Sequence, residues 1–137
     1  MGMLGLLADV NFRGQLQALL RICNSPAWQD VWASLGVSVR SFEDIGLLDD
    51  ASDATVWACC QSEGIVLVTD NRNQKGPDSL DATIRMRTLP SSLPVVTIAN
   101  TKRVLRDRRY AERVAVRLME VLIDIDLYRG VGRIFIP

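Results

Sequence analysis

The chain has 137 residues, of which 48% are hydrophobic and 23% are charged, the composition of an ordinary globular domain and not of a disordered tail or a repeat array. Lysine plus arginine and aspartate plus glutamate both number 16, so the formal net charge is zero. Overall charge therefore supplies no attraction for nucleic acid, and any contact with a polyanion must come from a local patch.

The cysteines indicate the cellular compartment. Their number is odd and two of them are adjacent, which is unsuited to a disulfide framework and favours a reducing cytosol; they are Cys23, Cys59 and Cys60. The apolar opening, residues 1–7, lacks the basic segment of a signal peptide, and no apolar run reaches the roughly 20 residues that cross a bilayer. We therefore expect a cytoplasmic protein without a membrane segment, folded as a single domain over residues 1–137.

The first third of the chain predicts two strands and two helices. Residues 3–8 are continuously apolar and stop at Asp9, as a buried central strand of a parallel sheet does. Asn11 is a plausible N-cap for the helix that follows. A second, short helix is expected over residues 27–35, and the alternation of residues 37–42 predicts a half-buried strand.

The middle of the chain predicts a helix, a glycine that ends it and a buried strand, which together form half of a βαβ unit. Ser52 is a good N-cap for a helix that Gly64 ends, and the apolar run at residues 65–69 follows directly. The polar stretch 70–77 is then a loop at the carboxyl end of that strand. Asp78 or the serine after it caps another helix.

The last part of the chain predicts a strand over residues 95–98, a long helix capped by Thr101 and reaching Ile125, and an edge strand over residues 134–136. Strands that alternate with helices imply a mostly parallel sheet covered on both faces. The expected fold class is therefore α/β, a three-layer α/β/α sandwich.

Acidic residues stand where the parallel strands are expected to end. Asp9 follows the first strand, Asp53 opens a helix just before a strand, and Asp70 ends the strand of residues 65–69. Because loops converge at the carboxyl ends of parallel strands, the three carboxylates could meet there. Clustered carboxylates repel one another unless a cation compensates them. The chain has no histidine, so oxygen ligands favour Mg²⁺ or Mn²⁺.

The ordered series of motifs resembles the compact PIN-like branch of the PIN-domain nucleases. The segments that carry the resemblance are residues 6–12, 45–47, 51–53 and 65–73. The resemblance implies an α/β/α fold, often a homodimer, and metal-dependent cleavage of single-stranded RNA, frequently as the toxin that an antitoxin protein restrains.

The resemblance also implies roles for individual residues. By matching position, Asp9, Asp53 and Asp70 would hold Mg²⁺ or Mn²⁺, and the metal would activate the attacking water. Asp78 is a further candidate metal ligand. Supporting roles or phosphate contacts are expected for Asn11, Asn71, Arg72 and Asn73.

Departures from the family pattern lie inside the same motifs. Val10 stands where an acidic residue is common, and Asn71 or Asn73 stands where a second aspartate is common. Asparagine can ligate a metal through its carbonyl oxygen but brings no charge, so the cation is held more weakly. Asp78 is the candidate for the missing carboxylate.

Other functions remain open. The first is a non-catalytic PIN-like interaction module, dimeric or bound to an antitoxin, in which the acidic pocket lacks adequate charge. The second is a phosphotransfer-type receiver domain, which also gathers acids at strand ends but lacks here an acidic doublet at the first strand.

Each of these motifs also has a purely structural explanation. Asp9 could cap the turn after its strand, and the segment 71–73 could be simple turn chemistry. Arginines at four-residue spacing in the last helix could follow an RNA backbone or form a solvated, ion-paired face; they are Arg109, Arg113 and Arg117.

Overall fold

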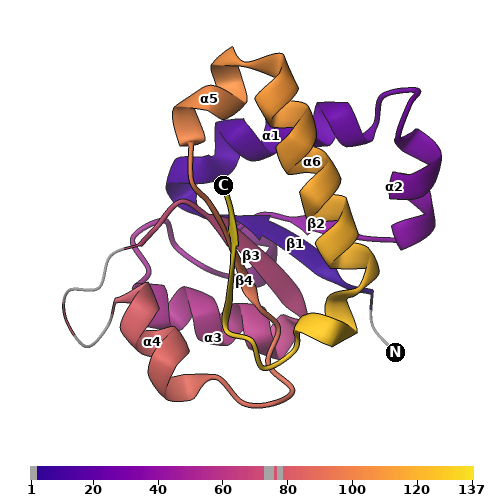
Figure 1. The fold of residues 1–137 in the computed structure, drawn as a ribbon. Helices are drawn as coiled ribbons and strands as arrows, with labels where there is room; N and C mark the ends of the chain where they lie inside the picture. Colours follow the sequence, from indigo (N-terminus) through magenta and orange to yellow (C-terminus); the bar gives the residue numbers. More distant parts are fainter. Residues whose placement is uncertain (1–2, 73–75, 77–78) are drawn as a thin grey trace.

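Strands and helices alternate along the computed structural model, which describes residues 3–72, 76 and 79–137 (Figure 1). The strands are β1 (Gly5–Ala8), β2 (Ser38–Arg40), β3 (Ile65–Thr69), β4 (Val95–Ile98) and β5 (Arg133–Ile136). The α-helices are α1 (Arg13–Cys23), α2 (Gln29–Leu35), α3 (Asp53–Glu63), α4 (Leu80–Arg87), α5 (Thr101–Arg106) and α6 (Arg108–Ile123). Three-residue or four-residue 3₁₀ turns are η1 (Val10–Phe12), η2 (Glu43–Ile45) and η3 (Ile125–Tyr128). Among the described residues, no helix is long and apolar enough to span a membrane.

The strands form one parallel sheet in the order β2-β1-β3-β4-β5. Leu7 of β1 lies opposite Arg40 on one side and Leu67 on the other. The chain runs outward from β1 to β2 and then returns past β1 to β3, so the strand order reverses between β1 and β3. In open parallel sheets, ligands bind at the carboxyl ends of the strands beside this reversal.

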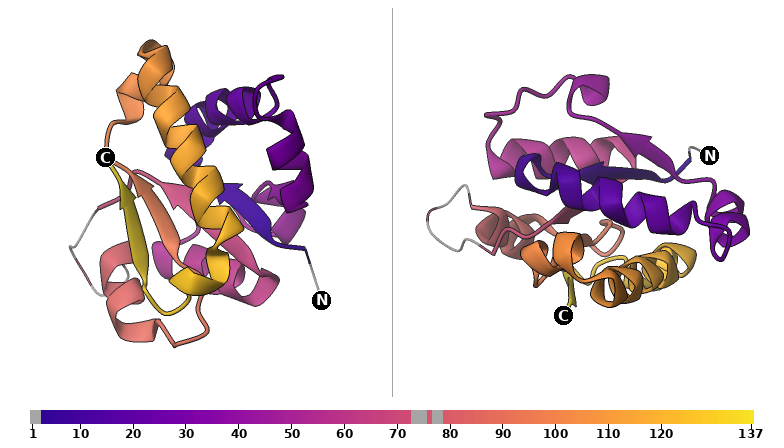
Figure 2. Two further views of the ribbon diagram at one scale, coloured as in Figure 1. Left: turned by 45° about the vertical axis from the view of Figure 1, so that its right-hand side comes forward. Right: turned by 90° about the horizontal axis from the view of Figure 1, so that it is seen from above.

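Helices cover both faces of the sheet, as Figure 2 shows from two further sides. On one face, α1, α5 and α6 pack against Leu6, Val66 and Val96. On the other face, α3 and α4 pack against Leu7 and Leu67. This arrangement confirms the α/β/α sandwich expected from the sequence. Because side chains alternate along a strand, the odd-numbered residues of β1 and β3 face α3 and α4.

The start of the first helical segment differs from the expectation. Asp9, and not Asn11, is the cap, because β1 ends directly at Asp9 and its carboxylate accepts a hydrogen bond from Val10 N at 2.9 Å. Asn11 is an exposed residue inside η1. Further along the chain, Ser79 caps α4, and Asp78 lies outside the described residues.

The long helix expected from Thr101 to Ile125 is instead two helices. Asp107 has extended backbone angles between α5 and α6. Its carboxylate accepts a hydrogen bond from Tyr110 N at 3.2 Å and from Arg103 Nη2 at 2.8 Å. An aspartate that satisfies the free N–H groups of the next turn offers the backbone an alternative to a continuous helix. The break therefore follows from capping by Asp107.

The tryptophans and two of the cysteines belong to the packing of the layers. Trp57 is buried in the α3 layer, and Trp28 and Trp32 are half-buried against the α1 layer. Burial raises the pKa of the Cys23 thiol to about 11 and, with a smaller contribution from nearby negative charge, the pKa of the Cys60 thiol to about 12. Both thiols stay protonated at neutral pH, which makes them poor nucleophiles.

Removing the cap between the last two helices tests its contribution to stability. We expect Asp107→Ala to lower the free energy of unfolding more than Asp126→Ala does, since an N-cap carboxylate and a partly exposed ion pair are lost together. Urea denaturation followed by circular dichroism measures the change. Asp126→Ala is the matched control, because it removes only the exposed pair with Arg129; an equal loss in the two variants would contradict the capping role.

Candidate functional site

Asp9 lies at the carboxyl end of β1, beside the reversal of strand order. One carboxylate oxygen, Oδ1, accepts a hydrogen bond from Val10 N at 2.9 Å, and the other, Oδ2, accepts one from Thr69 Oγ1 at 2.7 Å. The Asp9 amide also donates to Val68 O at 2.9 Å, which continues the pairing of β1 with β3. Asp9 therefore caps η1, and it is also fixed to the last residue of the neighbouring strand.

Thr69 continues this connection toward α3. Its side chain is fully buried, and its Oγ1 accepts a hydrogen bond from Asn71 N at 3.0 Å. Asn71 Nδ2 in turn donates to Asp53 Oδ2 at 3.1 Å. Leu80 N, in the first turn of α4, donates to the same oxygen at 3.1 Å. We call Asp9, Thr69, Asn71 and Asp53 the carboxyl-edge network.

Asp70 does not take part in this network. Its Oδ2 accepts a hydrogen bond from Thr101 Oγ1 at 2.8 Å, on the side of the sheet that α1 and α5 cover. The alternation of side chains continues past the end of β3, so Thr69 and Asn71 face α3 while Asp70 faces α5. Thr101, expected to be a helix cap, uses its hydroxyl for this contact, and α5 begins without a side-chain cap.

The structure therefore brings together only part of the predicted site. Asp9 and Asp53 share the network, whereas Asp70 lies on the opposite side of the sheet. Asn11 is exposed on η1 and enters no hydrogen bond with these residues. Asn73 and Asp78 lie outside the described residues. Within the described part of the chain, no group of three or more acidic, cysteine or histidine side chains is placed to hold a metal ion.

The side chain of a buried arginine on the edge strand β5 extends to the carboxyl-edge network. The Arg133 side chain is only 8% exposed, and its Nη1 donates to Asn71 O at 2.8 Å and to Thr97 Oγ1 at 2.6 Å. Its Nη2 lies 3.9 Å from Asp81 Oδ1. Burial lowers the pKa of Arg133, while the negative charges of Asp81 and Asp53 act in the opposite direction. Arg133 thus contacts the backbone of Asn71, the residue whose side chain donates to Asp53.

Arg72, an expected phosphate contact, lies over an exposed aromatic ring. Its guanidinium carbon is 5.6 Å from the centroid of Phe135, and the guanidinium of Arg133 is at the same distance from that ring. Phe135 is 56% exposed. An exposed aromatic face and a guanidinium therefore stand together at the edge of the sheet next to the carboxyl-edge network.

The basic residues of α6 are partly ion-paired with their own helix. Arg108 pairs with Glu112 at 3.0 Å, and Arg117 lies 3.9 Å from Glu120. These pairs agree with the solvated-face interpretation for that part of the helix. The alternative, that this stripe follows an RNA backbone, stays a prediction.

Four residues near the site were not singled out from the sequence. Thr69 and Thr97 are opposite each other in the register of β3 and β4, and both are fully buried. A threonine at the last position of an apolar strand, on the same face as Asp9, was the available signal. Arg133 and Phe135 come from β5, and no local pattern connects them with residues so distant in the sequence.

No family model, curated protein or solved structure matches this chain.

Replacing Arg133 tests how firmly the edge strand holds the site. Arg133→Met removes the donor for Asn71 O and Thr97 Oγ1, and unsatisfied buried polar groups should lower the free energy of unfolding by about 2 kcal/mol. Chemical denaturation gives the energy, and ¹H–¹⁵N NMR should show the Asn71 side-chain amide shifting. Arg85→Met, at an exposed arginine of α4, should change stability by less than about 0.5 kcal/mol. Equal stability in the two variants would rule out this role for Arg133.

Proposed function

We propose that this protein is a metal-dependent nuclease of the PIN-like class that cleaves single-stranded RNA. The observation that carries the proposal is the carboxyl-edge network. It fixes two carboxylates, those of Asp9 and Asp53, beside the reversal of strand order where open parallel sheets bind ligands. The α/β/α architecture agrees with the family resemblance of the sequence.

Asp9 and Asp53 are the residues that would hold Mg²⁺ or Mn²⁺. From the described residues, each of the two carboxylates accepts two hydrogen bonds. An ionised carboxylate has about four acceptor positions, so these contacts leave positions for a cation. Mg²⁺ is commonly held by one or two carboxylates together with substrate phosphates. When bound, the ion supplies activation of water and stabilisation of the leaving oxygen.

The protein's own side chains and amides orient these carboxylates. The Thr69 hydroxyl accepts from Asn71 N, so its proton is directed to Asp9 Oδ2. Asp53 Oδ2 is held from two directions, by the Asn71 side chain and by the backbone of α4. Side chains that are already fixed lose little freedom when substrate binds, which favours a reactive geometry.

Phe135 and Arg72 support a single-stranded substrate. Proteins that bind single strands combine aromatic faces, on which bases stack, with cations that contact the phosphates. The exposed Phe135 ring supplies such a face, and Arg72 lies against it. In this proposal the base stacks on Phe135 and the phosphate beside it contacts Arg72.

The proposal includes the partners that the resemblance implies. A PIN-like toxin would act as a homodimer and be restrained by an antitoxin protein. A small neighbouring gene that encodes an antitoxin would support this part of the proposal, and the molecular mass in solution would test the dimer.

A second candidate function is a non-catalytic interaction module. Asn71 directs an amide nitrogen at Asp53, and the positively charged Arg133 donates to the backbone oxygen of the same asparagine. These two groups compensate Asp53 without a metal ion. The module would keep the fold and the acidic edge but would cut no RNA.

Cleavage of single-stranded RNA with and without Mn²⁺ distinguishes the two functions. We expect Mn²⁺-dependent cleavage that Asp9→Asn and Asp53→Asn each reduce at least 100-fold, because each removes a metal ligand while preserving side-chain shape. A fluorogenic oligonucleotide reports the rate, and circular dichroism verifies folding.

Asp70→Asn is the matched control, since it makes the same chemical change on the opposite side of the sheet. Its activity should stay within about threefold of the unmodified protein, an effect of no more than about 0.7 kcal/mol on the activation barrier. The nuclease proposal fails if Asp9→Asn cleaves as fast as the unmodified protein. Absence of cleavage at every Mn²⁺ concentration would favour the interaction module.

A further inference from the structure

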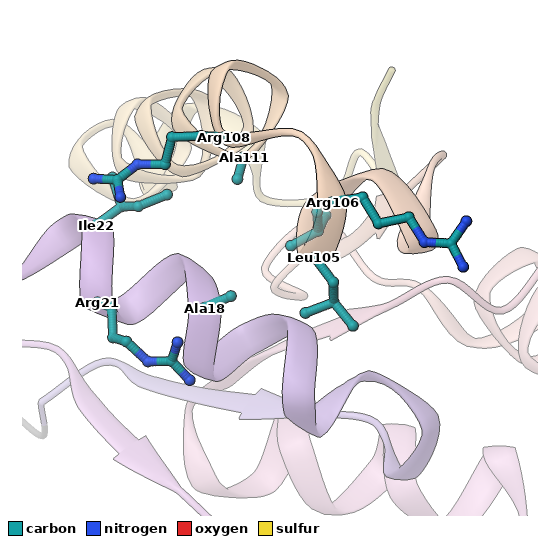
Figure 3. A pocket seen from close by; sticks show the side chains of 8 residues that line it. Ala18, Arg21, Ile22, Leu105, Arg106, Arg108 and Ala111 are labelled. Atoms are coloured by element: carbon teal, nitrogen blue, oxygen red, sulfur yellow. The ribbon is translucent and has the colours of Figure 1, made fainter.

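A second candidate site lies between α1 and the junction of α5 with α6, on the face of the sheet opposite Asp53. It is a cavity of about 320 Å³. Figure 3 shows the side chains that line it. They are Ala18, Arg21, Ile22, Val104, Leu105, Arg106, Arg108 and Ala111. The carboxyl-edge network contributes none of these residues, so the cavity is separate from the proposed nuclease site.

The floor of the cavity is aliphatic. Ile22, Val104 and Ala111 are almost fully buried there. Leu105 stands at the rim and is 58% exposed, although it is a large apolar side chain. In Figure 3, Leu105 extends into the space that Ala18 faces from α1. Covering Leu105 and filling the cavity would remove apolar surface from water, so an apolar group is the natural occupant.

Three arginines lie at the margin of this cavity, and Figure 3 shows the Arg108 side chain extending toward Ile22 and the Arg106 guanidinium extending away from α1. In the part of the chain that the structure describes, Arg21 and Arg106 form no ion pair. Arg108 pairs with Glu112 at 3.0 Å, but both side chains are exposed, so the pair is weak and can be exchanged for another carboxylate. The arginines at the margin of the cavity can therefore donate paired hydrogen bonds to the carboxylates of an anionic partner.

We propose that this cavity binds an acidic peptide segment of a protein partner, with one aliphatic side chain in the cavity and carboxylates on the surrounding arginines. Charge complementarity selects an acidic segment. Among the described residues that line the cavity, there is no aromatic ring on which a nucleic-acid base could stack. An aliphatic floor with a charged margin matches a leucine or isoleucine flanked by glutamates. This site lies beyond the proposed nuclease activity and does not depend on it.

The test uses a fluorescein-labelled helical peptide with one leucine flanked by glutamates, and the full-length protein. We expect fluorescence anisotropy to give a dissociation constant below about 100 µM, in the range of weak, transient recognition. In ¹H–¹⁵N NMR spectra, the resonances that shift should be those of Ala18, Ile22, Leu105 and Ala111. Replacing the peptide's leucine by serine should weaken binding about tenfold.

Protein variants show whether the cavity is the binding site. Arg21→Gln combined with Arg106→Gln should weaken binding about tenfold, and Leu105→Ser about fivefold. Arg85→Gln, an exposed arginine on the opposite face, should leave binding within about twofold. All four replaced side chains are exposed, so the variants should fold.

Three results would overturn the proposal. The first is the absence of peptide binding at about 1 mM. The second is binding that the arginine substitutions leave unchanged. The third is displacement of the peptide by a single-stranded oligouridylate whose own binding requires Arg21 and Arg106, because that result would assign the cavity to nucleic acid.

Discussion

The hydroxyl group of Thr69 connects the parts of the candidate site. It donates to Asp9 at the end of the neighbouring strand and accepts from the amide of Asn71. That second bond sets the course of the chain after β3, so that the Asn71 side chain meets Asp53 at the start of α3. A fully buried hydroxyl must satisfy its hydrogen-bonding capacity within the protein, and both bonds are therefore expected to persist in the folded state.

Charge balance at this edge of the sheet decides what the site can do. Asp9 and Asp53 bring negative charge, whereas Arg133 brings a buried positive charge from the opposite end of the chain. A cation bound by two carboxylates near a guanidinium is held less tightly than one in a cluster of several acids. Substrate phosphate would then complete the coordination of the ion, and binding of RNA and metal would be mutually dependent.

Much of the fold could be predicted from the sequence, because apolar runs and helical spacing report burial directly. That pattern predicts that two strands end at Asp9 and at Thr69. It does not predict the face of the sheet on which the Asp70 side chain lies, although continued alternation after β3 places this side chain on the opposite face from Asn71. The helix break at Asp107 was missed because a continuous apolar stripe hid a local cap. Arg133 could not be assigned to the candidate site from the sequence, since its contacts depend on the register between strands that are distant in the sequence.

The position of a bound metal ion tests the central claim most directly. A crystal of the protein soaked with Mn²⁺ should give an anomalous scattering peak about 2.0 to 2.4 Å from carboxylate oxygens of both Asp9 and Asp53. The side chain of Asp70 should remain hydrogen-bonded to Thr101. A peak on Asp70 instead, or the absence of any peak near Asp9 and Asp53 at high Mn²⁺ concentration, would contradict the claim that these two carboxylates form a metal site.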